Sequence, residues 1–297
     1  MIASFCSSQG IPLLRDVMLS ERTTFRIGGP ADFAVVPQNT QQLAAAVAFL
    51  NENNMRYFVL GKGSDMLADD KGYRGVLVLT EGLKNLSAEG DLITCGAGCS
   101  MASVSNLALR CGLAGLEFLH GIPGSIGGGV YMNAGAYGSE ISQYLQSVEW
   151  VDNQGKIHVS CVEELNFSYR HSFFSEQGGV VCSAVFRCPK GEPKEIKELM
   201  QDLDRRRREK QPLEYPSAGS AFKRPQSFFA GKLIEDCGLK GFSVGDACIS
   251  EKHAGFIINK GKATSEEVHA LIDHVTKVVY QKFGVTMEPE IRFLEEK

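Results

Sequence analysis

A glycine-rich run between residues 121 and 138 restricts the possible folds of this chain more than any other feature. Because glycine lacks a Cβ atom, such a run lets the backbone turn tightly and approach a ligand closely. A buried glycine crossover between two sheets is the alternative. The ligand interpretation is preferred because a second glycine loop accompanies the first. The run begins Gly121-Ile122-Pro123-Gly124-Ser125-Ile126-Gly127-Gly128-Gly129 and continues through Gly135 to Gly138.

Along the chain the first glycine loop is Gly61-Lys62-Gly63-Ser64-Asp65, which follows the apolar stretch 57–60, and the run from Gly121 is the second glycine loop. That stretch is a predicted strand, so the loop is expected to be a tight turn with exposed backbone N–H groups. Converging N–H dipoles without intervening Cβ atoms can hold a diphosphate. Neither loop has the Gly-Lys-Ser/Thr ending of a Walker loop, and neither is the Gly-x-Gly-x-x-Gly turn that opens a Rossmann helix.

The length of 297 residues favours two domains. Glycine is dense from residue 61 to 138 and thinner beyond, and a candidate boundary lies near Pro189 to Pro193. With 43% hydrophobic and 22% charged residues, the chain can bury a sizeable core. The formal net charge of -4 provides no general basic surface, so nucleic acid is not an expected partner.

Nine cysteines are scattered singly and form no C-x-x-C pair. This pattern indicates neither a disulfide framework nor a metal site. Residues 1–10 lack a basic segment followed by a long apolar one, and no later segment approaches the roughly 18 consecutive apolar residues of a membrane span. We therefore expect a cytoplasmic protein whose cysteines are small core residues and which has no membrane partner.

Apolar patterns predict a mixed α+β chain. The clearest helix begins at Thr264, where Glu267 completes a capping box, and its apolar stripe runs toward Gly284. A charged run at 205–208 is expected to be a solvated helix face, with one or two arginines facing a nucleotide diphosphate as the lesser hypothesis. The other predicted elements are strands at 32–36, 57–60, 76–79, 92–95, 148–151 and 180–186, and helices from 40 to about 53, from Ser100 to Gly112 and around 196–203.

Several further motifs stand along the chain in a fixed order. They are Thr24-Phe25-Arg26-Ile27-Gly28-Gly29-Pro30-Ala31, Tyr169-Arg170-His171-Ser172, Tyr215-Pro216-Ser217-Ala218-Gly219-Ser220-Ala221-Phe222-Lys223, Ala230-Gly231-Lys232-Leu233-Ile234-Glu235, His253-Ala254-Gly255-Phe256 and Pro289-Glu290-Ile291-Arg292. Together with the glycine loops, they resemble the UDP-N-acetylenolpyruvoylglucosamine reductases over about residues 15–294. The chain resembles the shorter, type II form of that family, because it lacks a long tyrosine-bearing insertion.

The resemblance implies an α+β fold in two domains. Residues 15–192 would form a two-part FAD-binding domain of the vanillyl-alcohol-oxidase (PCMH) type, and residues 193–297 a smaller α+β substrate-binding domain. The implied reaction is the reduction of UDP-N-acetylglucosamine-enolpyruvate to UDP-N-acetylmuramate by NADPH through FAD, a cytoplasmic step of peptidoglycan precursor synthesis. The implied protein is a monomer. The alternative is an FAD-dependent oxidase of the same superfold.

The resemblance also implies a noncovalent FAD with its diphosphate against the two glycine loops. Asp65 departs from the asparagine expected there, and its side chain is expected to point away from the phosphates. His120 precedes the second loop and is expected to be structural rather than a covalent flavin tether. The implied cofactor-binding residues are Gly61, Lys62, Gly63, Ser64, Asp65, Met66, Ile122, Pro123, Gly124, Ser125, Gly127 and Gly128.

Reduction of an enol ether that bears a carboxylate requires a hydride, stabilisation of negative charge and a proton for the second carbon. The resemblance assigns Arg170 to the enolate carboxylate, Glu290 to the carboxyl partner of Arg170, and Ser220 to the proton donor. Ser217 is the rival hydroxyl. Three basic residues are implied binders of substrate or nicotinamide phosphate: Lys210, Lys223 and Arg224, the last of which replaces an asparagine common in the family.

Overall fold

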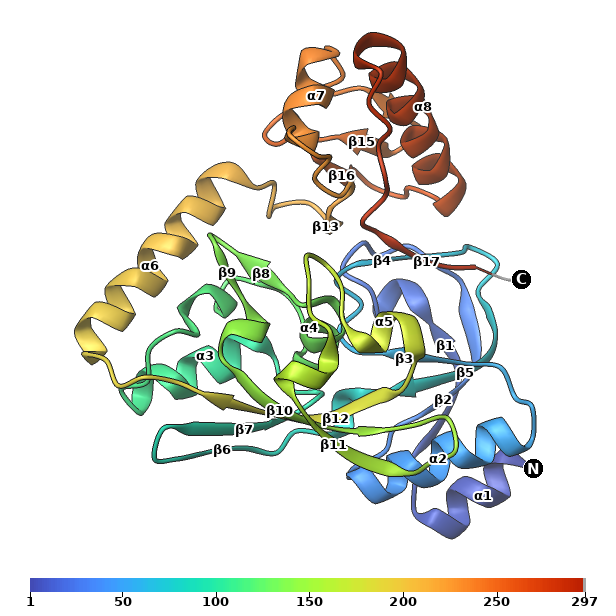
Figure 1. Ribbon diagram of the computed structural model, residues 1–297. Helices are drawn as coiled ribbons and strands as arrows, with labels where there is room; N and C mark the ends of the chain where they lie inside the picture. Colours follow the sequence, from blue (N-terminus) through green and yellow to red (C-terminus); the bar gives the residue numbers. More distant parts are fainter. Residues whose placement is uncertain (296–297) are drawn as a thin grey trace. The chain divides into compact units, whose positions relative to one another are not determined.

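The computed structural model describes residues 1–295, in which the chain forms two compact units (Figure 1). Unit 1 comprises residues 1–15, 33–62 and 75–206. Unit 2 comprises residues 16–32, 63–74 and those from 207 onward. Each unit buries a hydrophobic cluster of its own. The N-terminal third of the chain therefore contributes to both units.

An antiparallel sheet of five strands carries much of the core of unit 1. Val148, Ala184 and Cys95 are cross-strand partners in one row of this sheet, and all three are fully buried. Such rows of small and β-branched side chains stabilise the sheet through cross-strand packing. The strand order is β11 (Ile157–Cys161), β10 (Leu145–Val151), β12 (Val180–Arg187), β7 (Leu92–Gly96) and β6 (Leu86–Glu89).

A parallel strand pair positions the first glycine loop. β3 (Tyr57–Leu60) runs beside β5 (Tyr73–Leu79), with Leu60 opposite Leu79 at the end of β3. The loop starts at the next residue, Gly61. These strands belong to a sheet in the order β1 (Leu13–Met18), β2 (Pro30–Val35), β5 and β3.

The remaining elements of unit 1 are mostly helical. They are α1 (Ile2–Gln9), α2 (Thr40–Glu52), the 3-10 turns η2 (Thr80–Gly82), η3 (Glu117–Leu119), η4 (Ile141–Gln143) and η5 (Val162–Leu165), α3 (Met101–Arg110), α4 (Ile126–Met132), the short strands β8 (Gly135–Ala136) and β9 (Ser139–Glu140), and α5 (Phe173–Gln177). Helix α6 (Pro193–Lys210) carries the chain toward unit 2. Helix α4, which contains the end of the second glycine loop, packs against β12.

Unit 2 is a small sheet accompanied by two helices, drawn in orange and red in Figure 1. The sheet order is β13 (Ser217–Ser220), β16 (Phe256–Asn259), β15 (Ala247–Ile249) and β14 (Ser243–Val244), and the helices are α7 (Ala230–Asp236) and α8 (Ser265–Phe283). Two segments from opposite ends of the chain add a parallel pair, β4 (Met66–Ala68) with β17 (Arg292–Leu294). The short turn η1 (Leu19–Glu21) completes the unit.

The α+β prediction is confirmed, as is each predicted strand and helix to within a few residues at its ends, except that the helix expected around 196–203 continues to Lys210. The predicted capping box is present, because Thr264 accepts a hydrogen bond from Glu267 N while the Glu267 side chain accepts one from Thr264 N. The prediction for the cysteines was wrong in part. Cys111 and Cys161 are exposed and Cys237 is half-buried, because they lie at the end of α3, the end of edge strand β11 and the end of α7.

The boundaries of the two compact units differ from those of the predicted domains 15–192 and 193–297. Segments 16–32 and 63–74 belong with the C-terminal part, since β4 pairs with β17 there. The division at residue 192 stays a prediction about sequence domains. Among residues 1–295, the structure contains no helix whose length and apolar character would let it cross a membrane.

Candidate active site

The two glycine loops meet within unit 1. A Cβ atom on Gly61 would lie 2.2 Å from Ser125 Oγ and 3.8 Å from Thr80 Oγ1. Thr80 is only 4% exposed, and among the described residues its hydroxyl has no hydrogen-bond partner. A buried hydroxyl without a partner costs free energy, so Thr80 Oγ1 is suited to a ligand that brings an acceptor. The diphosphate of FAD meets that requirement, and sequence reasoning had missed Thr80.

The second loop is anchored to the segment that precedes α3. Gly127 N donates to Ala97 O at 2.8 Å, and Met101 N donates to Gly124 O at 3.1 Å. Gly127 has to be glycine for packing, because an added Cβ would lie 2.9 Å from the Cβ of Ala97. Gly128 is different. It is exposed, and its added Cβ would touch only Ser125 Oγ, at 3.6 Å.

The second half of the first loop lies in unit 2. Gly63 has a φ of +58°, and a Cβ there would lie 2.3 Å from Arg22 O, so both conformation and space require glycine. Thr24 N donates to Gly63 O at 3.0 Å, and Thr24 Oγ1 donates to Ser217 O at 2.7 Å. Arg292 N donates to Asp65 O at 3.0 Å, and the next residue, Met66, is buried in β4. These bonds place the loop beside the segments that carry Ser220 and Glu290.

Backbone hydrogen bonds bring Ser220 and Glu290 together in unit 2. Ser220 at the end of β13 pairs with Phe256 of β16. On the other side, Glu290 N donates to Ala221 O at 2.9 Å, which places Glu290 opposite the residue after Ser220. Both side chains are partly exposed. The segment that carries the Ser220 hydroxyl and the segment that carries the Glu290 carboxyl are thus neighbours in unit 2. The rival Ser217 lies at the other end of the same strand.

The predicted substrate-binding residues also lie in unit 2. Lys223 N donates to Glu288 O at 2.8 Å, and the Lys223 ammonium forms an ion pair with the Glu288 carboxylate. Lys210 is exposed at the end of α6. The Arg224 guanidinium carbon lies 4.0 Å from the ring centroid of Phe229, a cation–π geometry. Along the chain, Lys223 and Arg224 come just after the segment that carries Ser220.

Arg170 lies in unit 1, in a tight turn with a left-handed backbone. Ser168 and His171 exchange both backbone hydrogen bonds, at 3.1 and 3.2 Å, and so close the four-residue turn. Arg170 is the third residue of the turn and has a φ of +55°. A residue with a Cβ in that conformation costs about 1–3 kcal/mol and persists only where its surroundings hold it. The guanidinium carbon lies 5.1 Å from the centroid of the Tyr169 ring.

His120 precedes the second glycine loop and is held by an ion pair. Its Nδ1 lies 2.8 Å from Asp204 Oδ2 on α6. This contact supports the structural interpretation of His120. On the same helix, Arg205 and Arg206 both pair with Asp202, at 2.5 and 2.6 Å, as expected of a solvated helix face.

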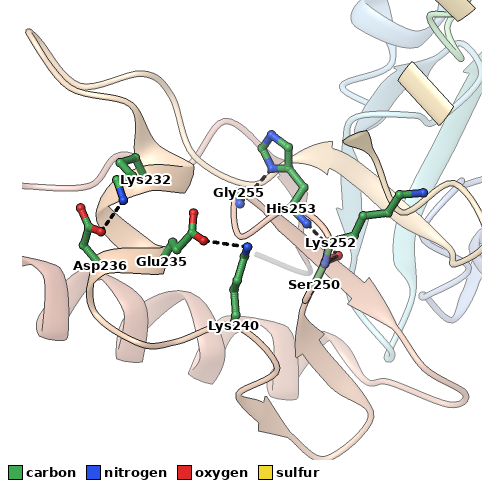
Figure 2. Close-up of polar contacts among 8 residues, drawn as sticks. All are labelled: Lys232, Glu235, Asp236, Lys240, Ser250, Lys252, His253 and Gly255. Atoms are coloured by element: carbon green, nitrogen blue, oxygen red, sulfur yellow. Dashed lines mark hydrogen bonds and ion pairs between the residues drawn. The ribbon is translucent and has the colours of Figure 1, made fainter. Parts of the chain in front are cut away.

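His253 begins one of the motifs noted in the sequence, where it was given no role, and it lies beside the Ser220 segment in unit 2. Gly255 N donates to His253 Nδ1 at 3.1 Å, as Figure 2 shows, and Gly255 O accepts from Ala221 N at 2.7 Å. Burial lowers the pKa of His253, and nearby Lys240 and Lys210 lower it further. With Nδ1 as an acceptor, the neutral ring carries its proton on Nε2.

This environment predicts how pH changes stability. The folded-state pKa of His253 lies below the ordinary value of 6.5, so neutral His253 contributes stability above that pH, and the contribution is lost as pH falls through the folded-state pKa. His253→Gln should therefore show a weaker loss of unfolding free energy on acidification than the natural protein. Urea unfolding at a series of pH values measures both curves. Parallel curves would contradict a buried neutral histidine.

Comparisons with known proteins agree with these features. Residues 211–294 match the family described as UDP-N-acetylenolpyruvoylglucosamine reductase, C-terminal domain, and residues 31–160 match the family described as FAD binding domain. A UDP-N-acetylenolpyruvoylglucosamine reductase of Clostridium novyi is 49% identical over 95% of this chain and 92% of that protein. The protein of that name in Caldanaerobacter subterraneus is 47% identical over 94% of this chain and 92% of its own length.

A solved structure extends the similarity to the fold. The crystal structure of UDP-N-acetylenolpyruvylglucosamine reductase from Thermus caldophilus matches with a TM-score of 0.84 at 35% sequence identity, covering 96% of this chain and 100% of that chain. Both units of the chain thus lie within the matched part.

Proposed function

The chain belongs to the UDP-N-acetylenolpyruvoylglucosamine reductase family, and we propose that Arg170, Ser220 and Glu290 carry out its reduction. It is an FAD-dependent oxidoreductase that reduces UDP-N-acetylglucosamine-enolpyruvate to UDP-N-acetylmuramate with NADPH, a step in peptidoglycan synthesis. The observation that carries the assignment of residues is the backbone pairing of the Ser220 segment with the Glu290 segment.

When bound, FAD would supply the hydride for one alkene carbon. Ser220 delivers a proton to the other carbon, which completes the saturation of the double bond. Arg170 binds the substrate carboxylate, where negative charge increases during the reaction, and its guanidinium can hold both oxygens at once. Glu290 is the carboxyl partner of Arg170. Lys210, Lys223 and Arg224 bind the phosphates of substrate or nucleotide.

The cofactor is held without a covalent bond in this proposal. Gly61 packs closely against Ser125 of the second glycine loop, and Thr80 offers a buried hydroxyl next to Gly61. The ion pair of His120 with Asp204 supports a structural role for that histidine. We further propose that the protein is a cytoplasmic monomer without a membrane partner. The net charge of -4 also favours the absence of a nucleic-acid partner.

A coupled assay with a Glu290 variant tests the function and the site together. The natural protein, loaded with FAD, should consume NADPH only when UDP-N-acetylglucosamine-enolpyruvate is added. Glu290→Gln should keep its FAD but turn over about 10- to 100-fold more slowly, because it loses a charge-assisted hydrogen bond of about 1.5–3 kcal/mol. Loss of NADPH absorbance measures both rates.

The outcomes separate the two claims. No substrate-dependent NADPH oxidation by the natural protein would contradict the function. Full activity of Glu290→Gln would contradict only the role of Glu290. If NADPH failed to bleach the flavin without oxygen present, the oxidase alternative would be favoured instead.

A further inference from the structure

A buried asparagine connects the second glycine loop to the turn that carries Arg170. Asn133 follows α4 directly, is 0% exposed and has a φ of +46°. Asparagine tolerates this left-handed conformation better than most residues with a Cβ. Both the NH2 group and the oxygen of its amide form hydrogen bonds, so Asn133 does more than end helix α4.

The Asn133 amide joins three segments of unit 1. Its Nδ2 donates to Ser168 O at 3.0 Å and to Glu140 Oε2 at 2.8 Å, and its Oδ1 accepts from Ser142 N at 3.1 Å. Ser168 is the first residue of the Arg170 turn, and its carbonyl also accepts the hydrogen bond from His171 N that closes this turn. Asn133 therefore bonds directly to the atom on which the turn depends.

A second hydrogen bond fixes the other side of the turn to the same helix. Ser172 is 0% exposed, and its Oγ donates to Tyr131 O of α4 at 2.6 Å. The segment with the left-handed Arg170 is thus attached to α4 on both flanks, at Ser168 and at Ser172. Helix α4 itself begins within the glycine loop that we propose holds the FAD diphosphate.

From these contacts we propose that Asn133 is a positioning residue for Arg170. Through Ser168, it sets the guanidinium at a fixed place relative to the flavin-binding loop, so that the substrate carboxylate is held in register with the cofactor. This inference rests on the proposed role of Arg170. A displacement of about 1 Å in such a group can cost up to about 100-fold in rate, so a single hydrogen bond at the turn can matter for catalysis.

Exchanging the amide of Asn133 with the carboxylate of Glu140 tests the hydrogen bond from Asn133 to Ser168 O. Asn133→Asp combined with Glu140→Gln keeps a hydrogen bond between positions 133 and 140 in the reverse direction and keeps an acceptor for Ser142 N. It replaces the donor to Ser168 O by a carboxylate oxygen, which cannot donate a hydrogen bond and repels that carbonyl oxygen. Glu140→Gln alone keeps that donor and is the matched control. Asn54→Gly, at another left-handed asparagine of unit 1, controls for backbone effects.

Binding to the oxidised, FAD-loaded protein, measured by calorimetry, is the first readout. The double variant should bind UDP-N-acetylglucosamine-enolpyruvate about tenfold more weakly, which corresponds to about 1.4 kcal/mol. It should bind UDP-N-acetylglucosamine, which has no carboxylate, as the natural protein does. A general structural defect would weaken both ligands. If the double variant does not fold, Asn133→Gly preserves the left-handed backbone, removes all three amide hydrogen bonds, and should show the same difference between the two ligands.

Arg170→Ala distinguishes failure of this inference from failure of the proposed function. Arg170→Ala should itself weaken the enolpyruvyl ligand, and adding the double exchange should then change little. If Arg170→Ala binds normally, the proposed role of Arg170 is wrong. If Arg170→Ala is weakened but the double exchange is not, or if the two effects simply add, Asn133 does not act through Arg170.

Discussion

Gly128→Val should purify without yellow colour while keeping its fold. Gly128 lies exposed in the first turn of α4, and its added Cβ would meet only Ser125 Oγ at 3.6 Å. The valine side chain would then occupy the space that we propose for the FAD diphosphate. Overpacking costs about 1–3 kcal/mol, so FAD binding should weaken by up to about 100-fold. Valine is no worse than glycine in a helix, so α4 itself should remain.

Visible absorbance of the purified protein and FAD titration of the apoprotein measure this effect. Gly128→Ala is the matched control and should bind FAD nearly normally, because its Cβ makes an ordinary contact. Gly127→Val should behave differently and lower the unfolding free energy, since its Cβ would lie 2.9 Å from Ala97 Cβ in the core. One FAD per chain in Gly128→Val would mean that the loop does not hold the cofactor.

Periodic patterns and capping signals were enough to predict the regular elements. The stripe after Thr264 became α8, with Val268, Leu271 and Val275 fully buried and the capping box in place. The glycines at 61 and 63 were correctly placed after a strand, because a tight turn at a strand end is a local property. The sequence therefore predicted well the elements and turns that depend only on hydrophobic periodicity and on turn residues close together in the chain.

Long-range features could not be predicted in this way. Nothing in the sequence around Thr80 shows that its hydroxyl lies beside Gly61 without a hydrogen-bond partner among the described residues, because that depends on how β5 meets the loop after β3. The role of Asn133 was equally hidden, since its partners lie up to 35 residues away. The pairing of β4 with β17 joins residues near 66 to residues near 292, so the units could not follow one sequence boundary.

Ser220 is a partly exposed serine, and we propose that its hydroxyl delivers a proton to the substrate. Its neighbours favour such a role. Glu290 is fixed opposite Ala221, and His253, whose pKa is lowered by burial, lies on the turn whose Gly255 O accepts from Ala221 N. The test has to separate proton delivery from every earlier step.

Ser220→Ala should separate the two halves of the reaction. Bleaching of the flavin colour by NADPH should proceed at nearly the natural rate, because that step does not require a proton on the substrate carbon. Return of the colour on adding UDP-N-acetylglucosamine-enolpyruvate requires that proton and should slow by about 10²- to 10⁴-fold, the usual effect of losing a positioned general acid. Ser220→Cys should retain more activity than Ser220→Ala, since a thiol can also deliver a proton.

Stopped-flow absorbance follows both steps on one sample, with Ser217→Ala as the matched control at the other end of β13. Equal slowing of both steps, or of neither, would remove Ser220 as the donor, and slowing of the second step in Ser217→Ala alone would transfer the role to Ser217.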